Sequence, residues 1–218
     1  MVKNVHFYTC IIYTIYVIIL IKENKMNKDI LFNKFPCLET KEIILKKIEN
    51  ENADDLFEIL TNKNIFKYTH GNPLKTMEAV KNVIGHYERD FNKQKTIFLG
   101  IFLKSEKKKL VGIAEIFDFN YDVNSVEVGY RINENYWGKG LATKATALMV
   151  EYLFNKINVN RIQATSMPIN KNSHKVLLKN GFVCEGTLRQ VKKWTGTGIV
   201  DLTFYSILKS EYDKNLKK

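Results

Sequence analysis

One strand–helix–strand segment, residues 125–167, constrains the fold of this chain more than any other part of it. Residues 125–132 have the pattern of a strand, residues 141–155 that of a helix, and residues 161–167 that of a second strand. Two strands joined through a helix pair in parallel, with a right-handed crossover. The segment therefore predicts a βαβ unit in the middle of the fold.

The rest of the chain adds helices and strands without a Pro/Gly/Ser-rich linker or an internal repeat. The predicted strands are apolar runs, and the longest predicted helix before the crossover has apolar residues at spacings of three or four. Before the crossover we expect a strand over 39–48, a helix over 53–60 capped by Asn52, a helix over 75–91, and hairpin strands over 96–103 and 110–119. After it we expect a helix over 171–180 capped by Gly181, and hairpin strands over 182–194 and 199–208. This order predicts a mixed α+β fold.

The first 25 residues differ from the rest of the chain. Their apolar run, residues 7–21, is shorter than the ~18–20 residues of a bilayer-spanning helix and lacks a small-residue cleavage site. A short membrane anchor, an uncleaved signal-like segment and a spurious upstream start are the alternatives. Because Met26 begins a second, ordinary-looking start, we favour the spurious start, with an anchor second, and expect a single domain over residues 26–218.

The charge of the chain narrows the classes of partner. Lys plus Arg is 34 against 23 for Asp plus Glu, a formal net charge of +11, so the surface should attract anions. Most of the cations are lysine, whereas base-specific readout relies on the bidentate arginine fork, and we expect no sequence-specific nucleic-acid binding. The cysteines, Cys10, Cys37 and Cys184, show neither CxxC spacing nor Cys/His clustering. They predict a reduced, cytoplasmic protein without zinc or a disulfide framework.

The turn before the crossover helix, residues 136–143, is the best candidate for a binding site. Gly138 and Gly140 allow a sharp turn whose amides point outward directly before a helix N-terminus, an arrangement that binds phosphate oxygens. The P-loop pattern is absent, and Thr143 stands where a dinucleotide fingerprint needs a small residue. A glycine pair alone is more often a plain turn, but its place between a strand and a helix favours a ligand.

Four motifs in this order resemble the acetyl-CoA signature of the GCN5-related N-acetyltransferase (GNAT) superfamily. They are residues 127–132, 137–142, 170–173 and 179–182. The resemblance is closest to the Rim-type (RimJ/RimL) ribosomal-protein N-terminal acetyltransferases. It implies a central, mostly antiparallel, splayed sheet with flanking helices and one βαβ crossover, and acetyl-CoA as cosubstrate without a metal.

Two residues depart from the pattern of the wider superfamily. Trp137 stands where many members have Gln or Arg, and Leu177 stands where many others carry a catalytic Tyr. Both substitutions are familiar in the Rim-type branch. They favour this branch of the superfamily, and Leu177 removes the usual proton donor.

The resemblance also implies which residues hold the cofactor. The pyrophosphate is expected on backbone amides of the turn, the amide-bearing arm along the exposed backbone of the splayed strand, and a further contact at Asn170. The strand residues are Val128, Tyr130 and Ile132, and the turn residues are Gly138, Lys139, Gly140, Ala142 and Thr143. An amide within residues 128–130 would meet the developing oxyanion. The remaining phosphate has three equal candidates, Lys139, Lys144 and Lys171.

Acetyl transfer to an amine needs a proton acceptor for the amine and a proton donor for the departing thiolate. Glu127, in an otherwise apolar strand, is the first candidate for the base, against an even chance of an ordinary outward-facing residue. Glu115 follows the same logic with less support from the motifs. Ser173 is the candidate donor, although Ser173 and Asn170 equally suit helix capping.

Other reactive residues favour structural interpretations. His70 lies in the loop region that shapes the acceptor mouth in the family, yet a lone loop histidine is usually solvated. His174 is more typical of a surface helix residue than of a base. Cys184 has no adjacent base and is predicted to lie in the core, and Met77 and Met149 also fit core spacing.

The sequence says less about the amine that accepts the acetyl group. The resemblance implies the N-terminal amine of a protein, a ribosomal protein above all. A polyamine or an aminoglycoside would call for a cluster of acids, and the +11 balance argues mildly against that. Outside enzymes, the alternatives are a nucleotide- or CoA-binding module without activity and a basic RNA-associated protein. We expect acetyl-CoA and the amine as partners of a monomer or homodimer, and a membrane only where residues 1–25 are translated.

The alternatives for residues 1–25 lead to a direct test. If Met26 is the true start, a chain beginning there should be soluble, monodisperse and as active as the full chain. Size-exclusion chromatography and an acetylation assay check this. Recovery of peptides from residues 1–25 in the membrane fraction of native cells would favour the anchor instead.

Overall fold

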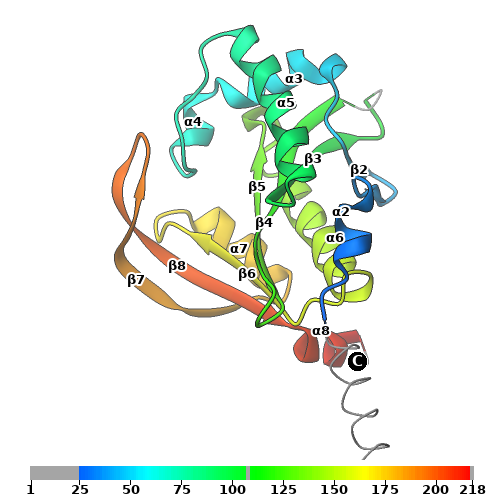
Figure 1. The fold of residues 1–218 in the computed structure, drawn as a ribbon. Helices are drawn as coiled ribbons and strands as arrows, with labels where there is room; N and C mark the ends of the chain where they lie inside the picture. Colours follow the sequence, from blue (N-terminus) through cyan, green and yellow to red (C-terminus); the bar gives the residue numbers. More distant parts are fainter. Residues whose placement is uncertain (1–24, 107–108, 217–218) are drawn as a thin grey trace, which may run out of the picture.

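The computed structural model describes residues 25–106 and 109–216, in which eight strands form one mixed sheet (Figure 1). Their spatial order is β1-β2-β3-β4-β5-β6-β8-β7. The strands are β1 (Leu38–Glu39), β2 (Ile43–Lys46), β3 (Thr96–Leu103), β4 (Lys109–Asn120), β5 (Ser125–Ile132), β6 (Arg161–Ser166), β7 (Val183–Trp194) and β8 (Gly198–Leu208). Of the neighbouring pairs in this part of the chain, β5 and β6 run parallel and the rest antiparallel.

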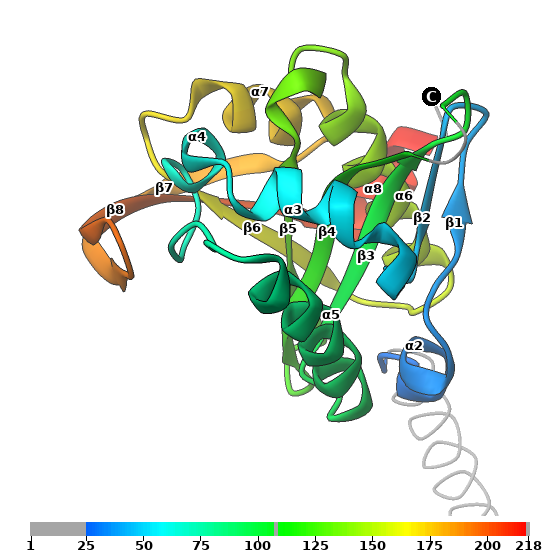
Figure 2. The same cartoon turned by 90° about the horizontal axis from the view of Figure 1, so that it is seen from above.

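Helices cover both faces of the central strands. They are α2 (Lys28–Asn33), α3 (Ala53–Leu60), α4 (Lys63–Phe66), α5 (Met77–Asn92), α6 (Leu141–Asn155), α7 (Lys171–Lys179) and α8 (Lys209–Leu216), with short 3-10 turns at Asn50–Asn52 and Glu134–Tyr136. Figure 2 shows α5 and α6 on opposite sides of the sheet. The predicted mixed α+β fold with one crossover is confirmed.

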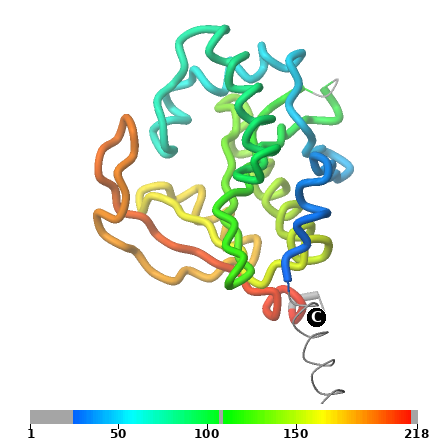
Figure 3. The backbone as a smooth tube through the Cα atoms, viewed as in Figure 1, coloured from blue at the N-terminus to red at the C-terminus, as the bar shows by residue number. Residues whose placement is uncertain are grey.

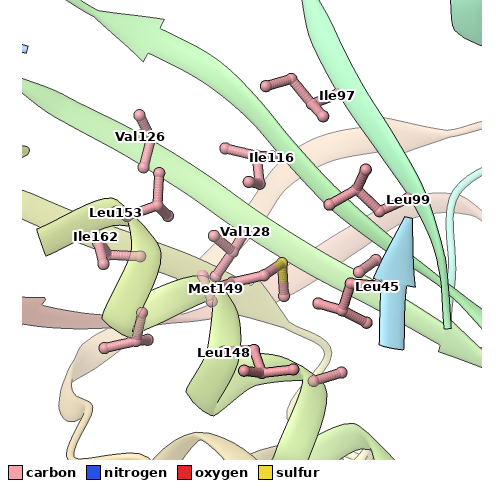
Figure 4. Packing of buried hydrophobic residues seen from close by; sticks show 14 of the residues in the cluster. Leu45, Ile97, Leu99, Ile116, Val126, Val128, Leu148, Met149, Leu153 and Ile162 are labelled. Carbon is pink, nitrogen blue, oxygen red and sulfur yellow. The ribbon is translucent and has the colours of Figure 1, made fainter. Parts of the chain in front are cut away.

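The burial of β3 explains why its sequence is a continuous apolar run. Ile97, Leu99 and Ile101 pack into the core on the α6 side, which Figure 4 shows at close range. Phe98 and Phe102 pack into the second core, under α3 and α5. Because both faces are covered, this strand lacks the polar alternation of a surface strand.

The two parallel strands separate soon after they meet. β5 pairs with β6 through three residues, of which Glu127 opposite Gln163 is the last, whereas its pairing with β4 continues to Ile132. Beyond Glu127, the edge of β5 that faces β6 is therefore without a strand partner. This is the splayed geometry that the resemblance implies, and it opens a gap at the centre of the sheet.

Most boundaries agree with the predictions, and the differences have local causes. The strands over 96–103 and 125–132 and the helix over 141–155 are as predicted. The strand predicted over 39–48 is instead broken at Thr40, whose hydroxyl accepts hydrogen bonds from the amides of Glu42 and Ile43. Asn52 does not cap α3 through its side chain, because its Oδ1 accepts the Glu49 amide at 2.9 Å.

Short elements were missed in the sequence. Neither α2, α4 nor the C-terminal α8 was predicted, because each has too few turns for a clear apolar period.

The predicted leader, residues 1–25, lies outside the described residues except for its last position. Within residues 25–106 and 109–216, no helix combines the length and the apolar character needed to cross a bilayer.

Candidate active site

Two cavities adjoin where β5 and β6 separate. The strand-gap cavity, of about 410 Å³, is lined by residues of β5 and β6 beside their gap. The glycine-turn cavity, of about 320 Å³, lies against the turn before α6. Residues that line both are Tyr68, Thr69, Tyr130, Arg131, Asn170 and Ser173. A ligand that fills the glycine-turn cavity can therefore present its end to a second molecule in the strand-gap cavity.

The turn before α6 has the backbone of an anion site. Gly138 and Gly140 have φ of 76° and 75°, the left-handed region that residues with a Cβ rarely adopt. No atom lies within 4 Å of where their Cβ atoms would stand, so the surface above the turn is open. Gly140 is the N-cap of α6, and the cavity is lined from Gly140 through Thr143. The first amides of a long helix thus face an open cavity.

The lysines are placed differently from the prediction. Lys144 forms an ion pair with Glu42, and the Lys139 ammonium lies 4.5 Å from the ring centroid of Tyr136. Neither residue lines the glycine-turn cavity, and nor does Lys171.

The cations of that cavity come from α7. Lys175 and Lys179 line it, one helical turn apart. Sequence reasoning missed both residues, although their spacing of four on a predicted helix that follows the turn was a usable signal. They are further candidates for the remaining phosphate of the cofactor, beside the three predicted lysines.

The open edge of β5 connects the two cavities. Val128 lines the strand-gap cavity, Tyr130 lines both, and Ile132 lines the glycine-turn cavity. Trp137 stabilises the end of the strand, because its Nε1 donates a hydrogen bond to the Ile132 carbonyl at 2.8 Å. The departure at Trp137 therefore has a structural role: it ties the glycine turn to β5.

The two candidate bases differ in how their carboxylates are occupied. Glu127 is half-buried in the strand-gap cavity, and Thr165 Oγ1 donates a hydrogen bond to it at 2.8 Å. Burial raises the pKa of the Glu127 carboxyl, and the Thr165 hydrogen bond opposes the rise only in part. Glu115 is ion-paired with Arg131 at 2.5 Å. The geometry thus favours Glu127 over Glu115 as a proton acceptor.

Ser173 lies where the cavities adjoin, at the start of α7. Asn170 caps this helix, since its Oδ1 accepts the Ser173 amide at 3.2 Å, and both residues also line the cavities. The Tyr130 hydroxyl donates a hydrogen bond to Ser173 Oγ at 3.1 Å, a contact that the sequence did not reveal. Burial raises the Tyr130 pKa, which keeps this phenol protonated. The proton of the Ser173 hydroxyl is thereby left for another acceptor.

The remaining predicted residues have clear places. His174 is not a free base, because its Nε2 lies 3.1 Å from the Met167 carbonyl oxygen. Leu177 is buried, with 2% of its surface exposed. His70 lines the strand-gap cavity. The prediction that Cys184 lies in the core is wrong: it is exposed, because β7 is an edge strand whose residues 183–193 are all exposed.

Comparisons with known proteins agree with this geometry. Residues 42–183 match the family described as "Acetyltransferase (GNAT) domain". An uncharacterised N-acetyltransferase of Bacillus subtilis strain 168, YoaA, is 30% identical over 175 residues, 80% of this chain and 98% of that protein. The ribosomal protein uS5-alanine N-acetyltransferase of Escherichia coli K12 is 30% identical over 98 residues, 44% of this chain and 50% of that protein. The structure of Mycobacterium smegmatis RimJ in complex with CoA-disulfide has a TM-score of 0.71 at 20% identity, over 81% of this chain and 88% of that one.

The open glycine turn predicts a cofactor-dependent gain in stability. At 100 times its dissociation constant, acetyl-CoA or CoA should stabilise the protein by about 2.7 kcal/mol. Gly140→Val should remove this shift, because its side chain would stand above the amides that face the ligand. Differential scanning fluorimetry measures both.

The control for Gly140→Val is Gly186→Val. Gly186 also has a positive φ, 139°, and open space around its Cβ position, but lies on β7 away from both cavities. Both variants should lose some stability through backbone strain, about 1–2 kcal/mol, yet only Gly186→Val should keep the ligand shift. No shift of the wild type with either ligand would contradict the site.

Proposed function

The chain belongs to the GNAT acetyltransferase family and is an acetyl-CoA-dependent N-acetyltransferase, and we propose that its acceptor is the N-terminal amine of a protein, first of all a ribosomal protein. The name of the E. coli relative supports the ribosomal class. The exposed thiols of Cys37 and Cys184, both free, support a reduced cytoplasmic setting. The observation that carries the proposal is a contact between two loops beside the strand-gap cavity.

This contact, the clasp, consists of Gly71, Asn72, Thr195 and Gly196. The β7–β8 hairpin curves toward the chain that follows α4 (Figures 1 and 3), and the Gly71 amide donates to the Thr195 carbonyl at 3.3 Å. A Cβ at Gly196 would overlap the Asn72 side chain and lie 3.0 Å from the Gly71 carbonyl oxygen. The loops therefore touch with no room for a side chain between them.

The clasp joins two walls of the strand-gap cavity. Residues 68–70, directly before it in the chain, line one wall, and Lys192 and Trp194 line the other. A free chain end can enter a cavity bridged in this way, whereas an internal segment of polypeptide would have to pass through as a loop. The clasp thus supports an N-terminal amine over an internal lysine as the acceptor.

The charges of the cavity disfavour the predicted alternatives. The strand-gap cavity holds two carboxylates, Glu115 and Glu127, and two cations, Arg131 and Lys192. A polyamine or an aminoglycoside carries several positive charges and calls for a surplus of acids. The balanced cavity favours an acceptor with a single ammonium.

The residues at the junction can carry out the proton transfers. We assign the cofactor's pyrophosphate to the amides of the glycine turn and its arm to the open edge of β5, where backbone groups can pair with it as with a strand. Glu127 takes a proton from the ammonium of the acceptor, and an amide of residues 128–130 stabilises the developing oxyanion. Ser173, with its hydroxyl oriented by Tyr130, donates its proton to the thiolate that leaves when the carbon–sulfur bond breaks. It regains a proton from the acylated nitrogen, which loses its second proton as the new carbon–nitrogen bond is completed.

The acceptor can be tested with one peptide that has a free α-amine and one internal lysine, alongside spermidine. Mass spectrometry should find the acetyl group predominantly on the α-amine, with only a small share on the lysine, and spermidine should remain unmodified. Acetylation of spermidine without acetylation of the peptide would contradict the proposal.

Gly196→Ala tests the clasp, and Gly198→Ala is its control. Both glycines have similar positive φ, 87° and 94°, but no atom lies within 4 Å of a Cβ at Gly198. Gly196→Ala should open the clasp and raise the share of lysine acetylation by about fivefold, about 1 kcal/mol in relative transition-state energy. Gly198→Ala should leave that share unchanged.

Glu127→Gln tests the base. It keeps the shape of the side chain and should lower kcat/KM by about 10²–10⁴ at neutral pH, while the affinity for acetyl-CoA hardly changes. Because a protonated carboxyl accepts no proton, wild-type kcat/KM should fall as pH decreases through the raised pKa of Glu127. The deficit of the variant should shrink at high pH, where free amine is abundant. Equal activity of the two proteins from pH 6 to 9 would remove Glu127 as the base.

A further inference from the structure

A bulge in β7 determines which side chain of this strand enters the strand-gap cavity. After a first register shift between Cys184 and Gly186, β7 and β8 pair in register from Gly186 opposite Phe204 to Leu188 opposite Leu202, and pairing resumes at Lys192 opposite Val200. Residues 189–191 therefore stand opposite Asp201 alone. Bulges of this kind change the direction in which the following side chains point.

The bulge is held by a specific contact. Gln190 has φ of 52°, in the left-handed region, which is uncommon for a residue with a long side chain. Its amide donates to Asp201 Oδ1 at 2.7 Å, so an acidic side chain of β8 stabilises the strained residue. Strain that a local contact maintains on an otherwise exposed strand indicates a function for the geometry it produces.

The residue that follows the bulge lies in the cavity. Lys192 and Trp194 line the strand-gap cavity, whereas Lys193, between them, does not. Since successive side chains of a strand point to opposite faces, Lys193 lies on the far side of the hairpin. Lys192 thus points into the strand-gap cavity, and the neighbouring Lys193 points away from it.

Two charged groups that line the strand-gap cavity form no ion pair with another described residue. Its titratable residues other than tyrosine are His70, Glu115, Glu127, Arg131 and Lys192. Glu115 and Arg131 are ion-paired with each other, and the described part of the chain shows no ion pair for Glu127 or Lys192. The positive charge of Lys192 acts on Glu127 and opposes the effect of burial on the Glu127 pKa. One anion and one cation therefore face the same space.

We propose that Lys192 is a specificity-determining residue that selects acceptors with a negative group close to the reacting amine, such as a protein N-terminus with an acidic second residue. The proposal rests on the proposed function and names its substrate class. The ammonium of such an acceptor lies toward Glu127 and its anion toward Lys192. A second positive charge beside the amine is repelled by Lys192.

The test uses three peptides that differ only in the second residue, glutamate, glutamine or lysine, each assayed for kcat/KM with the full chain. Wild type should prefer glutamate to lysine by about tenfold, mainly through KM, as expected for a partly solvated charge pair. Lys192→Gln should reduce this ratio to near one, and Lys192→Glu should invert it. Lys193→Gln, the control, should keep the wild-type ratio.

The outcomes separate this proposal from the proposed function. Acetylation of all three peptides at equal rates, or a ratio that survives Lys192→Gln, would overturn the role of Lys192 and leave the N-terminal acceptor standing. Acetylation of free glutamate but of none of the peptides, with a loss of that activity in Lys192→Gln, would support the role of Lys192 and overturn the protein acceptor. Acetylation of the lysine peptide above the glutamate peptide by wild type would contradict the proposal directly.

Discussion

Three residue pairs between β5 and β6 hold the two halves of the sheet together, and their separation beyond Glu127 produces the site. β5 stays fixed along its other edge by β4, while β6 continues toward β8 and α6 packs beneath the gap. The main chain of β5 thus has one edge in the sheet and one edge free for a ligand. If β5 and β6 paired over more residues, the gap between them would close. If they did not pair at all, the two halves of the sheet would no longer be joined.

Part of this arrangement could be predicted from the sequence and part could not. β5 and α6 have strong local patterns, so their bounds were predicted correctly, and β6 ends one residue before its predicted end. The backbone need for glycine at the turn is local too. Lys175 and Lys179 were missed because which face of α7 lines the glycine-turn cavity depends on how this helix packs. The exposure of Cys184 depends on the tertiary position of β7 at the edge of the sheet, and an apolar run alone does not reveal an edge.

The charge of the site differs from the charge of the chain. The formal net charge of +11 comes from the excess of Lys and Arg over Asp and Glu in the whole chain, whereas the strand-gap cavity has two carboxylates, two permanent cations and one histidine. The surface charge favours encounters with polyanionic assemblies at long range, and under our proposals the cavity discriminates at short range between the amines that arrive. Approach and selection are therefore controlled by different residues, and the bulge at Gln190 contributes only to selection.

The hydrogen bond from Trp137 to the Ile132 carbonyl has a further consequence. It ties the glycine turn to the end of β5, the strand whose residues line both cavities, so the turn and this end of the strand shift together. The bond closes residues 132–137 into a short loop, which limits how far Gly138 and Gly140 can move relative to Tyr130. Under the cofactor placement that we propose, a carrier with a longer or shorter arm would bind by its phosphates and still hold its thioester away from Glu127 and Ser173.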